Sequence, residues 1–248
     1  MKIDVYTVCW NEEIRLPYFL RHYEQFANNI VVFDNESSDG SRKMVEDHPK
    51  GILKTYSSNG QIRDDLYLQI KNNVWKTDKT ADWVIIVDVD ELFYAKDIIK
   101  FLENAEKNEY TIIKPKGLKF WSENSPTTSG QIYEEIYMAK ECLTKMCCFR
   151  PKEIQEINYL PGCHNANPTG NVKILETSMA YFLHFHFIGK EFIDKRREQY
   201  KARLSEWNKK YDLGTHYMAG KEGNTERFEV MRNNPEYTDI RKELGIEI

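Results

Sequence analysis

The first hundred residues alternate short apolar runs with segments in which apolar residues recur every three or four positions. Short apolar runs are typical of strands that are buried on both faces, and the longer spacing is typical of an amphipathic helix. The pattern predicts four strands, at Ile3–Cys9, Ile30–Phe33, Ile52–Tyr56 and Trp83–Val87. Because strands and helices alternate, we expect a mostly parallel central sheet with right-handed crossovers.

Three helices are predicted between these strands, and they are expected to flank the sheet. The apolar faces of two of them consist of Leu16, Leu20, Tyr23 and Ala27 and of Ile62, Leu66, Ile70 and Val74. The third is expected to begin near Ser38 and Asp39, because both side chains are good helix N-caps.

From about Tyr110 the pattern changes to strand-like runs separated by loops rich in Gly, Pro and Asn. Further strands are predicted at Thr111–Lys114, Ile132–Met138, Lys145–Phe149 and Met179–Phe187, and a helix at Lys190–Lys210. We therefore expect one α/β domain over residues 1–189 and a C-terminal helical extension over residues 190–248 that packs on the same domain.

The composition fits a globular protein of this size. Apolar residues make up 41% and aromatic residues 13% of the 248 positions, which is enough for a sizeable core. The net charge is −4, whereas dedicated nucleic-acid-binding proteins usually carry a basic excess, so no nucleic-acid partner is expected. The N-terminal residues lack the pattern of a signal peptide, and no apolar run approaches the roughly 20 residues that span a bilayer, which predicts a cytoplasmic protein.

The five cysteines are odd in number and irregularly spaced. Without an export signal, this pattern predicts reduced thiols rather than disulfides. A zinc site formed by Cys142, Cys147, Cys163 and His164 is the alternative, although no CxxC pair supports it. His164 also lies in a loop rich in Gly and Asn that suits either sugar hydroxyls or a plain turn.

Polar clusters follow three of the predicted strands, at residues 11–13, 34–40 and 88–91. Ligands of parallel sheets bind beyond the carboxyl ends of the strands, so these clusters are candidates for a binding site. Asp34 is accordingly expected to be accessible to solvent and free of core packing. The alternative is that Asn, Asp, Ser and Gly occur there because they form turns.

Asp88, Asp90 and Glu91 place three carboxylates directly after a strongly apolar strand. Their mutual repulsion is unfavourable unless a cation compensates for it. Side chains alternate along an extended segment, so Asp88 and Asp90 point to the same side and suit Mn²⁺ or Mg²⁺. A solvated acidic turn is the alternative interpretation.

The run from Cys9 to Gly40 resembles the opening of family-2-like glycosyltransferases of the GT-A fold, with Asn-Glu after one strand and Asp-Asn-x-Ser-x-Asp-Gly after the next. DWVIIVDVDELF resembles the DxD strand of the same group, and KMCCFRP and LHFHF extend the resemblance. The resemblance implies a GT-A-like domain. It also implies an inverting, metal-dependent transfer of sugar from a nucleotide-sugar, expected to be a UDP-sugar, to a glycan or lipid-linked acceptor.

The resemblance also implies roles for individual residues. Asp34 would accept a hydrogen bond from the base imide, Asn11 and Glu12 would line the pocket for base and ribose, and Asp88 would lie near the ribose. The metal ligands would be Asp88, Asp90, His184 and His186. Two histidines at i and i+2 on a strand share one face, although such pairs are also common as structural residues.

Arg63, Lys145 and Arg150 are candidates for stabilising the charge of the diphosphate, and salt bridges are the alternative for each. The candidate catalytic residues are Asp90, Glu91 and Glu134. Many inverting relatives carry a Glu-Asp pair at the acceptor side, and the sequence does not contain one in that position. The base is therefore expected among Glu123, Glu134 and Glu135.

The predicted helix Lys190–Lys210 carries eight basic and four acidic residues, with Phe185, Phe187, Phe192 and Trp207 nearby. It is expected to be either a solvated helix or a peripheral contact with an anionic membrane that holds the acceptor. Two rival functions remain. A nucleotidyltransferase is disfavoured because no Gly-rich phosphate loop follows the first strand. A non-catalytic nucleotide- or glycan-binding protein of the same fold is the other rival.

Overall fold

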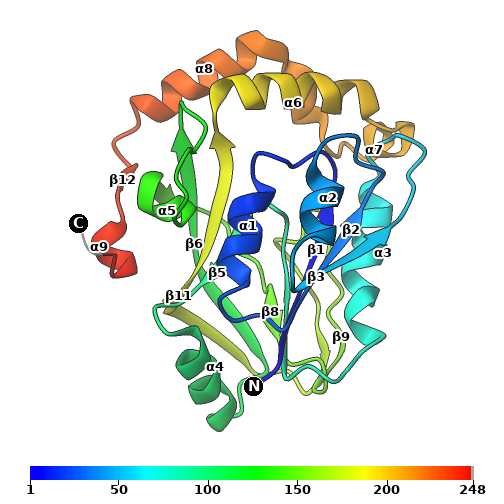
Figure 1. Cartoon of the computed structure of the whole chain (residues 1–248), viewed down its shortest axis with the longest axis vertical. Coiled ribbons are helices and arrows are strands. Elements are labelled where there is room, and N and C mark those ends of the chain that lie inside the picture. Colours follow the sequence, from blue (N-terminus) through cyan, green and yellow to red (C-terminus); the bar gives the residue numbers. More distant parts are fainter. Residues whose placement is uncertain (247–248) are drawn as a thin grey trace.

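The computed structural model describes residues 1–246, apart from the side chains of residues 216 and 219–222. Ten of the described strands form one sheet, and helices flank it (Figure 1). The strands lie in the order β12-β7-β6-β8-β4-β1-β2-β3, and β11 pairs with β5 and β6 beside this row. The predicted α/β fold class is confirmed.

One half of the sheet is entirely parallel. It consists of β3 (Gly51–Thr55), β2 (Asn29–Asp34), β1 (Ile3–Cys9) and β4 (Trp83–Ile86). β1 lies at its centre with a partner on each side, and Val5 is fully buried there between Ile30 and Ile85. The apolar runs of β1, β2 and β4 are buried because strands covered on both faces need apolar side chains at successive positions, whereas β3 is an edge strand whose residues are half-buried or exposed.

The other half of the sheet is mixed, although its longest ladder, between β6 (Ile112–Ser122) and β11 (Ile174–Ile188), is parallel. β5 runs antiparallel to β11, β7 and β8 run antiparallel to β6, and β12 pairs with β7. Two further strands, β9 and β10, form a separate small sheet. The bounds of these strands are β5 (Glu91–Tyr94), β7 (Met138–Glu141), β8 (Cys148–Phe149), β9 (Ile154–Glu156), β10 (Thr169–Gly170) and β12 (Thr238–Asp239).

The helices lie around the sheet and across one of its ends. They are α1 (Leu16–Tyr23), α2 (Ser41–Glu46), α3 (Asp64–Asn73), α4 (Ile98–Lys107), α5 (Ile132–Glu135), α6 (Lys190–Arg203), α7 (Glu206–Lys210), α8 (Gly220–Arg232) and α9 (Arg241–Leu244), with 3-10 turns η1 (Val74–Lys76) and η2 (Thr215–Ala219). Helices α6 and α8 cross the end of the sheet toward which β11 points (Figure 1). None of the described helices is long and apolar enough to cross a membrane.

Gly189 is the only residue between β11 and α6. Its φ of 73° lies in the left-handed region, where a side chain is strained, and a Cβ would collide with Ser125. A side chain at this position is therefore excluded both by the backbone conformation and by the neighbouring loop.

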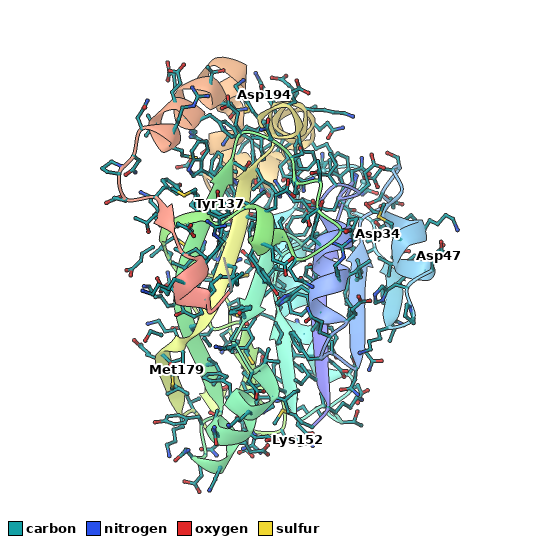
Figure 2. The ribbon with its side chains drawn as sticks, turned by 60° about the vertical axis from the view of Figure 1, so that its left-hand side comes forward. Asp34, Asp47, Tyr137, Lys152, Met179 and Asp194 are labelled. Carbon is teal, nitrogen blue, oxygen red and sulfur yellow. The ribbon has the colours of Figure 1, made fainter. Side chains whose placement is uncertain are left out.

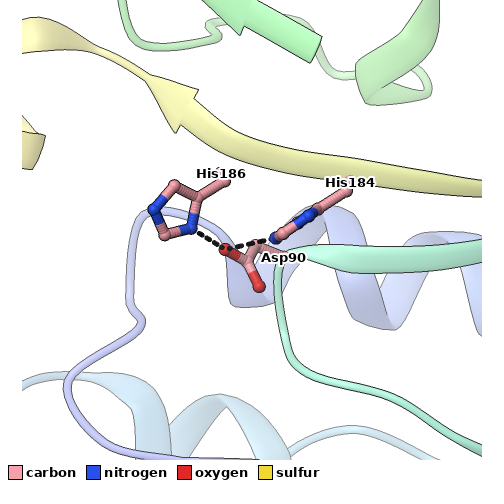
Figure 3. Close-up of side chains that lie close together, drawn as sticks. All are labelled: Asp90, His184 and His186. Carbon is pink, nitrogen blue, oxygen red and sulfur yellow. Dashed lines mark ion pairs between the residues drawn. The ribbon is translucent and has the colours of Figure 1, made fainter. Parts of the chain in front are cut away.

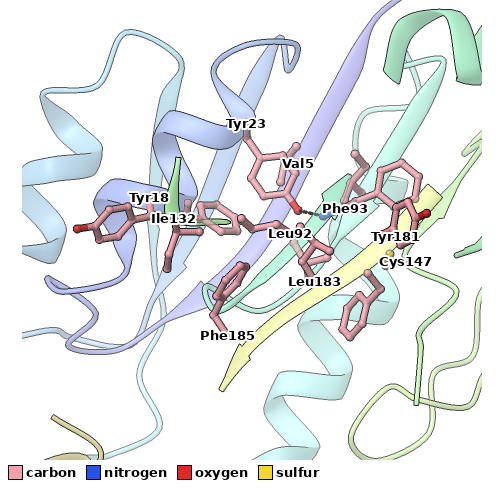
Figure 4. Close-up of a cluster of buried hydrophobic side chains, with 14 of the residues drawn as sticks. Val5, Tyr18, Tyr23, Leu92, Phe93, Ile132, Cys147, Tyr181, Leu183 and Phe185 are labelled. Carbon is pink, nitrogen blue, oxygen red and sulfur yellow. Dashed lines mark hydrogen bonds between the residues drawn. The ribbon is translucent and has the colours of Figure 1, made fainter. Parts of the chain in front are cut away.

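Helix α1 covers the outer edge of β5 and completes its hydrogen bonds. The hydroxyl of Tyr23 accepts from the amide of Phe93 (2.9 Å, Figure 4) and donates to the carbonyl of Glu91 (3.2 Å). Nε2 of His22 lies 2.9 Å from the carbonyl oxygen of Phe93, so this ring nitrogen is the donor. An exposed strand edge would leave these backbone groups to water, and the two side chains satisfy them inside the core.

Two sequence predictions in the second half of the chain were wrong. Residues 132–138 are not a strand: α5 forms over Ile132–Glu135, and β7 begins only at Met138. A capping box stabilises the start of α5, because the side chain of Glu134 accepts from the amide of Gln131 (2.9 Å). The single helix predicted over residues 190–210 is two helices, and Ser205 caps the second by accepting from the amide of Asn208 (3.1 Å).

The basic face of α6 does not form the surface that a membrane contact requires. Arg196 and Arg197 are buried against the rest of the chain, and Phe185 and Phe187 are buried in the core. An interfacial helix instead exposes an apolar face that enters the membrane and carries its basic side chains on the opposite, polar face. The structure therefore gives no support to the membrane alternative.

All five cysteines are free thiols, as predicted, and four of them are buried. The candidate zinc ligands Cys142, Cys147, Cys163 and His164 do not form a cluster with metal-binding distances in the described part of the chain. Burial raises the pKa of the Cys163 thiol, which disfavours the thiolate that zinc requires.

His22 is expected to make the stability of the fold depend on pH. Burial lowers its pKa to about 4, and its Nδ1 is buried with no hydrogen-bond partner in the described structure. The unfolded chain binds a proton near pH 6.5, so the free energy of unfolding should fall as pH drops from about 6.5 to 4. A shift of this size corresponds to about 3 kcal/mol.

The measurement is urea denaturation between pH 4 and 8 for the wild type and His22→Gln, which keeps a donor for the Phe93 carbonyl. The variant should be less stable at pH 8 but lose less stability on acidification. Parallel pH curves for the two proteins would contradict the assignment.

Candidate functional site

A cavity of about 400 Å³ opens at the carboxyl ends of β1 and β4, below α6. Its walls come from segments far apart in the chain: the end of β1, α3, the turn after β4, the loop near His164, β11 and α6. The polar and aromatic side chains that line it include Trp10, Glu12, Arg15, Asp64, Lys71, Asp88, Asp90, Glu91, Lys145, His164, His184, His186, Arg196, Arg197 and Tyr200. This edge of the sheet is where the polar clusters of the sequence were expected to meet.

Asp88 is held by two lysines from different elements. Nζ of Lys71, on α3, contacts one carboxylate oxygen, and Nζ of Lys145 lies 2.9 Å from the other. Burial raises the pKa of the Asp88 carboxyl, but Lys145 and Lys71 outweigh it and the pKa lies below its usual range. Asp88 is therefore an ionised carboxylate whose position two cations determine.

Glu91 stabilises the turn that contains Asp88 and Asp90. One of its carboxylate oxygens accepts from the amide of Asp88 (2.9 Å), and the other pairs with Lys145 (2.5 Å). Its side chain is almost fully buried, and burial is the main cause that raises its pKa. Because both oxygens are already engaged, the contacts of Glu91 are those of a residue that positions the turn, rather than those of a free acid or base.

Asp90 lies between a buried arginine and two histidines. Its Oδ2 is 2.8 Å from Nη1 of Arg15, 3.7 Å from Nε2 of His184 and 3.5 Å from Nδ1 of His186 (Figure 3). Burial opposes ionisation, but Arg15 and the histidines hold the pKa of the Asp90 carboxyl well below its usual range. The carboxylate is thus charged and faces two imidazoles.

A β-bulge in β11 places the two histidines. The register of β11 against β6 shifts between His184 and Phe187, which pair with Lys119 and Trp121 respectively. A bulge bends a strand and redirects its side chains, and bulges are frequent beside functional sites. Figure 3 shows the rings of His184 and His186 on the same side of β11, both directed toward Asp90.

Asp90, His184 and His186 form a candidate metal site. One ligand atom from each lies within 4.8 Å of the others, and in the described residues no other set of three or more His, Cys, Asp or Glu side chains meets this condition. Burial lowers the pKa of His186 to about 3, so its imidazole is neutral, as a metal ligand must be. A carboxylate with two imidazoles fits a divalent transition metal.

Arg196 of α6 fixes the start of the loop after β1. Its guanidinium donates to the carbonyl of Asn11 (3.1 Å), to the carboxylate of Glu12 and to the hydroxyl of Tyr200. Arg15 makes a similar link between segments, because its Nη2 donates to the carbonyl of His186 (3.2 Å). These two buried arginines connect β1, β11 and α6 around the cavity.

Seven of the predicted site residues line the cavity: Glu12, Asp88, Asp90, Glu91, Lys145, His184 and His186. Asn11, Asp34, Arg63 and Glu134 are not among its lining residues. Asn11 instead joins two loops, since its side chain accepts from the amide of Ser38 (2.8 Å) and its amide donates to Ser37 (2.9 Å). Its φ of 51° is in the left-handed region, which Asn tolerates.

The expectation that Asp34 is accessible was wrong. Its side chain is only 1% exposed, and its Oδ2 accepts from the amide of Ser37 (3.0 Å) and from Arg42 (2.6 Å). Figure 2 shows Asp34 on the same side of the molecule as Asp47, the residue that follows α2. Oδ1 of Asp34 is buried without a hydrogen-bond partner among the described residues. Asp34 is therefore part of the folded loop itself.

Two other assignments are corrected by local contacts. Arg63 forms a two-point ion pair with Asp65, its neighbour at the start of α3, and does not face the cavity (2.6 and 2.8 Å). Glu134 is an exposed residue of the α5 capping box and does not line the cavity, so the structure gives no support to its expected role as the base. The other candidates are also engaged elsewhere: Glu123 with Arg232, Glu135 with Thr127 and Thr128, and Arg150 with Glu106.

The sequence did not predict several cations that complete the site, among them Arg15, Lys71 and Arg196. The sequence contains one indication for Lys71, which lies three residues after Leu68 and four before Trp75, a spacing that places the three side chains on one helical face. A lysine at such a position is buried and needs a partner. No comparable pattern marks Arg15 or Arg196, because their partners lie in distant segments.

A scan against protein-family models gives no match, and a search of curated proteins gives none either. Similar solved structures include S. aureus TarS residues 1–349 (TM-score 0.45, 14% identity, 95% of this chain and 75% of that chain). In the longer TarS structure this chain spans only 37% of that chain (TM-score 0.46, 14% identity, 75% of this chain). Another is glucosyl-3-phosphoglycerate synthase from Mycobacterium tuberculosis with Mn²⁺, UDP and glucosyl-3-phosphoglycerate. The match has a TM-score of 0.34 and 11% identity, and it covers 47% of this chain and 44% of that chain. All these TM-scores are below 0.5, so the inferences below rest on the residues of this chain.

Replacing Asp34 is expected to destabilise the protein. Asp34→Ala removes the acceptor for the buried amide of Ser37 and the partner of Arg42. Lost hydrogen bonds to a charged group cost about 1.5–3 kcal/mol, which should appear as a lower urea midpoint with an unchanged slope. Asp47→Ala is the matched control, because Asp47 is an exposed residue at the C-terminal end of α2, the helix that carries Arg42 (Figure 2). Equal midpoints for the two variants would contradict this account.

Proposed function

We propose that this protein is a metal-dependent glycosyltransferase that moves a sugar from a nucleotide-sugar, in the first place a UDP-sugar, to a glycan or lipid-linked acceptor. The observation that carries the proposal is the cluster of Asp90, His184 and His186 next to the lysine-held Asp88, in a cavity at the carboxyl ends of parallel strands. Residues 1–189 supply these side chains, and the C-terminal extension from residue 190 covers them.

The proposed metal ligands favour Mn²⁺ over Mg²⁺. Mg²⁺ prefers oxygen ligands in a strict octahedron, whereas imidazole nitrogens suit later divalent metals. Held by Asp90 and the two histidines, the cation would neutralise charge on the diphosphate of the donor. Arg15 keeps the Asp90 carboxylate in position by an ion pair that does not depend on the metal.

The lysine pair on Asp88 supports the same proposal. Lys71 and Lys145 are both buried at the cavity wall, and in the free chain Asp88 and Glu91 balance their two charges. The departing nucleoside diphosphate develops negative charge, and preorganised cations in a site with little water stabilise that charge.

The acceptor hydroxyl must lose a proton as its oxygen bonds to the anomeric carbon and the bond from that carbon to the diphosphate breaks. We assign this proton to Nε2 of His164, which lines the cavity. Nδ1 of His164 faces the carbonyl of Thr144 at 3.4 Å and so carries the ring proton, which leaves Nε2 as the acceptor. Burial, with Lys145 adding to it, lowers the pKa of His164 and keeps the imidazole neutral.

The binding of UDP is expected to depend on the metal. Calorimetry should show UDP binding at least about tenfold more tightly with Mn²⁺ than with EDTA, and less gain with Mg²⁺. Asp90→Ala should remove the difference, and His184→Ala should raise the Mn²⁺ concentration that is needed. Asp47→Ala and His48→Ala are matched controls outside the cavity. Equal affinity for UDP with Mn²⁺ and with EDTA would overturn the metal-bridged site.

Turnover tests the catalytic part of the proposal. The release of UDP from a UDP-sugar, with water as the acceptor, should fall about 100-fold or more in His164→Gln while the affinity for UDP stays within about twofold. His48→Gln should keep the wild-type rate. An unchanged rate in His164→Gln would remove its assignment as the base.

The same assay separates the rival functions. UDP binding without metal-dependent release of UDP in the wild type would favour the non-catalytic binding protein. Formation of pyrophosphate from UTP and a sugar phosphate would favour the nucleotidyltransferase.

A further inference from the structure

Arg197 is a buried guanidinium whose terminal nitrogens have no hydrogen-bond partner. Its side chain is 3% exposed, and both Nη1 and Nη2 are buried without a partner in the described part of the chain. The adjacent Arg196 differs, because its guanidinium donates to three groups. A guanidinium carries five N–H donors, and burying them unpaired is costly. Such a side chain indicates an anion that the isolated chain does not contain.

The surroundings of Arg197 are also cationic. The guanidinium of Arg197 lies 5.5 Å from the centroid of the Phe187 ring, and Nζ of Lys119 lies 4.7 Å from the same centroid. Arg227 of α8 adds a third charge, next to Phe228, which packs edge-on against Phe187. Burial lowers the pKa of Arg197, and Arg227 lowers it further. Like charges held together in this way need a counter-charge.

Asp194 is the carboxylate that raises the pKa of Arg197, and it already has other partners. Asp194, one turn before Arg197 on α6 (Figure 2), pairs with Lys190 at 3.1 Å and accepts from the side-chain amide of Asn224 at 2.9 Å. For Lys119, no carboxylate is among the main groups that shift its pKa. The described residues therefore leave this cationic group without a full counter-charge.

Arg197 borders the cavity on the α6 side, away from the lysines that hold Asp88. Arg197 and Lys119 both lie over the ring of Phe187, and Phe187 directly follows the proposed metal ligand His186. Lys71 and Lys145, by contrast, contact Asp88 at the end of β4. Arg197 and the two lysines therefore contact different parts of the cavity wall: Arg197 lies against Phe187 of β11, and the lysines hold Asp88 at the end of β4.

We propose that Arg197 binds an acidic group of the acceptor, a phosphate or a carboxylate, with both terminal nitrogens. Lys119 and Arg227 raise the local positive potential around it. The assignment of this acidic group to the acceptor rests on the proposed function, in which the donor diphosphate lies near Lys71 and Lys145. A planar guanidinium matches two oxygens of a phosphate or carboxylate in a two-point contact, which gives orientation as well as affinity.

Sulfate is the probe, because it has the geometry of phosphate and stays soluble with Mn²⁺. We would titrate sulfate into the full chain by calorimetry at constant ionic strength, first alone and then with saturating UDP and Mn²⁺. Sulfate should bind in both cases, and Arg197→Met should weaken it at least about tenfold. Arg232→Met is the matched control, since Arg232 lies on α8 and pairs with the exposed Glu123. It should leave the affinity for sulfate unchanged.

Stability gives an independent readout. Without sulfate, Arg197→Met should not lower the Tm, because the guanidinium that it removes has no hydrogen-bond partner; a purely structural arginine would lower it. If Arg197→Met does not fold, Lys119→Met and Arg227→Met serve instead, and each should weaken sulfate several-fold.

Three results would overturn the subsite. They are a wild type that does not bind sulfate, sulfate binding that survives in Arg197→Met, and loss of sulfate binding when UDP and Mn²⁺ are present. The last result would place the anion at the donor diphosphate, and the proposed function would stand. The titration without UDP needs neither donor nor turnover, so failure of the proposed function and failure of the subsite are separate outcomes.

Discussion

The three carboxylates that follow β4 impose the main electrostatic constraint on this fold. Asp88, Asp90 and Glu91 lie within four residues at the end of β4, with side chains that are 34%, 12% and 2% exposed, and each has a positive neighbour that favours its ionised form. The partners come from α3, from the loop before β8, from the start of α1 and from β11. Each of these segments is held against the end of β4 by the pairs that it makes. The arrangement of the cavity follows from that requirement.

The structure meets the constraint by sharing partners. Lys145 contacts both Asp88 and Glu91, and Oδ2 of Asp90 faces both Arg15 and the histidines. Sharing means that removing one partner of a buried ion pair leaves another charge exposed to the low dielectric of the interior, which is strongly destabilising. It also means that Asp90 has a cationic partner whether or not a metal is bound. The site is therefore assembled in the folded chain.

The parallel half of the sheet could be predicted from the sequence, because strands buried on both faces leave apolar runs such as Trp83–Ile86 that are visible without tertiary information. The carboxylates and the His184 and His186 pair were identified for a similar reason, since each is a local pattern. Glu134 and Arg63 do not line the cavity, because a capping box and a two-residue ion pair hold them in their own segments. The partners of Arg15 and Arg196 could not be predicted, because they lie in segments that only the folded chain brings together.

The single-residue connection at Gly189 has a consequence for how this surface can evolve. The histidines of β11 and the arginines of α6 belong to one uninterrupted stretch of chain, with no loop between strand and helix that could change in length. An insertion there would rotate α6 by about 100° per added residue and carry its arginines away from the cavity. Variation in what the cavity accepts is therefore confined to substitutions within α6 and to the loops of the opposite wall. A lineage that lost the glycine would have to remodel the metal side and the helical cover together.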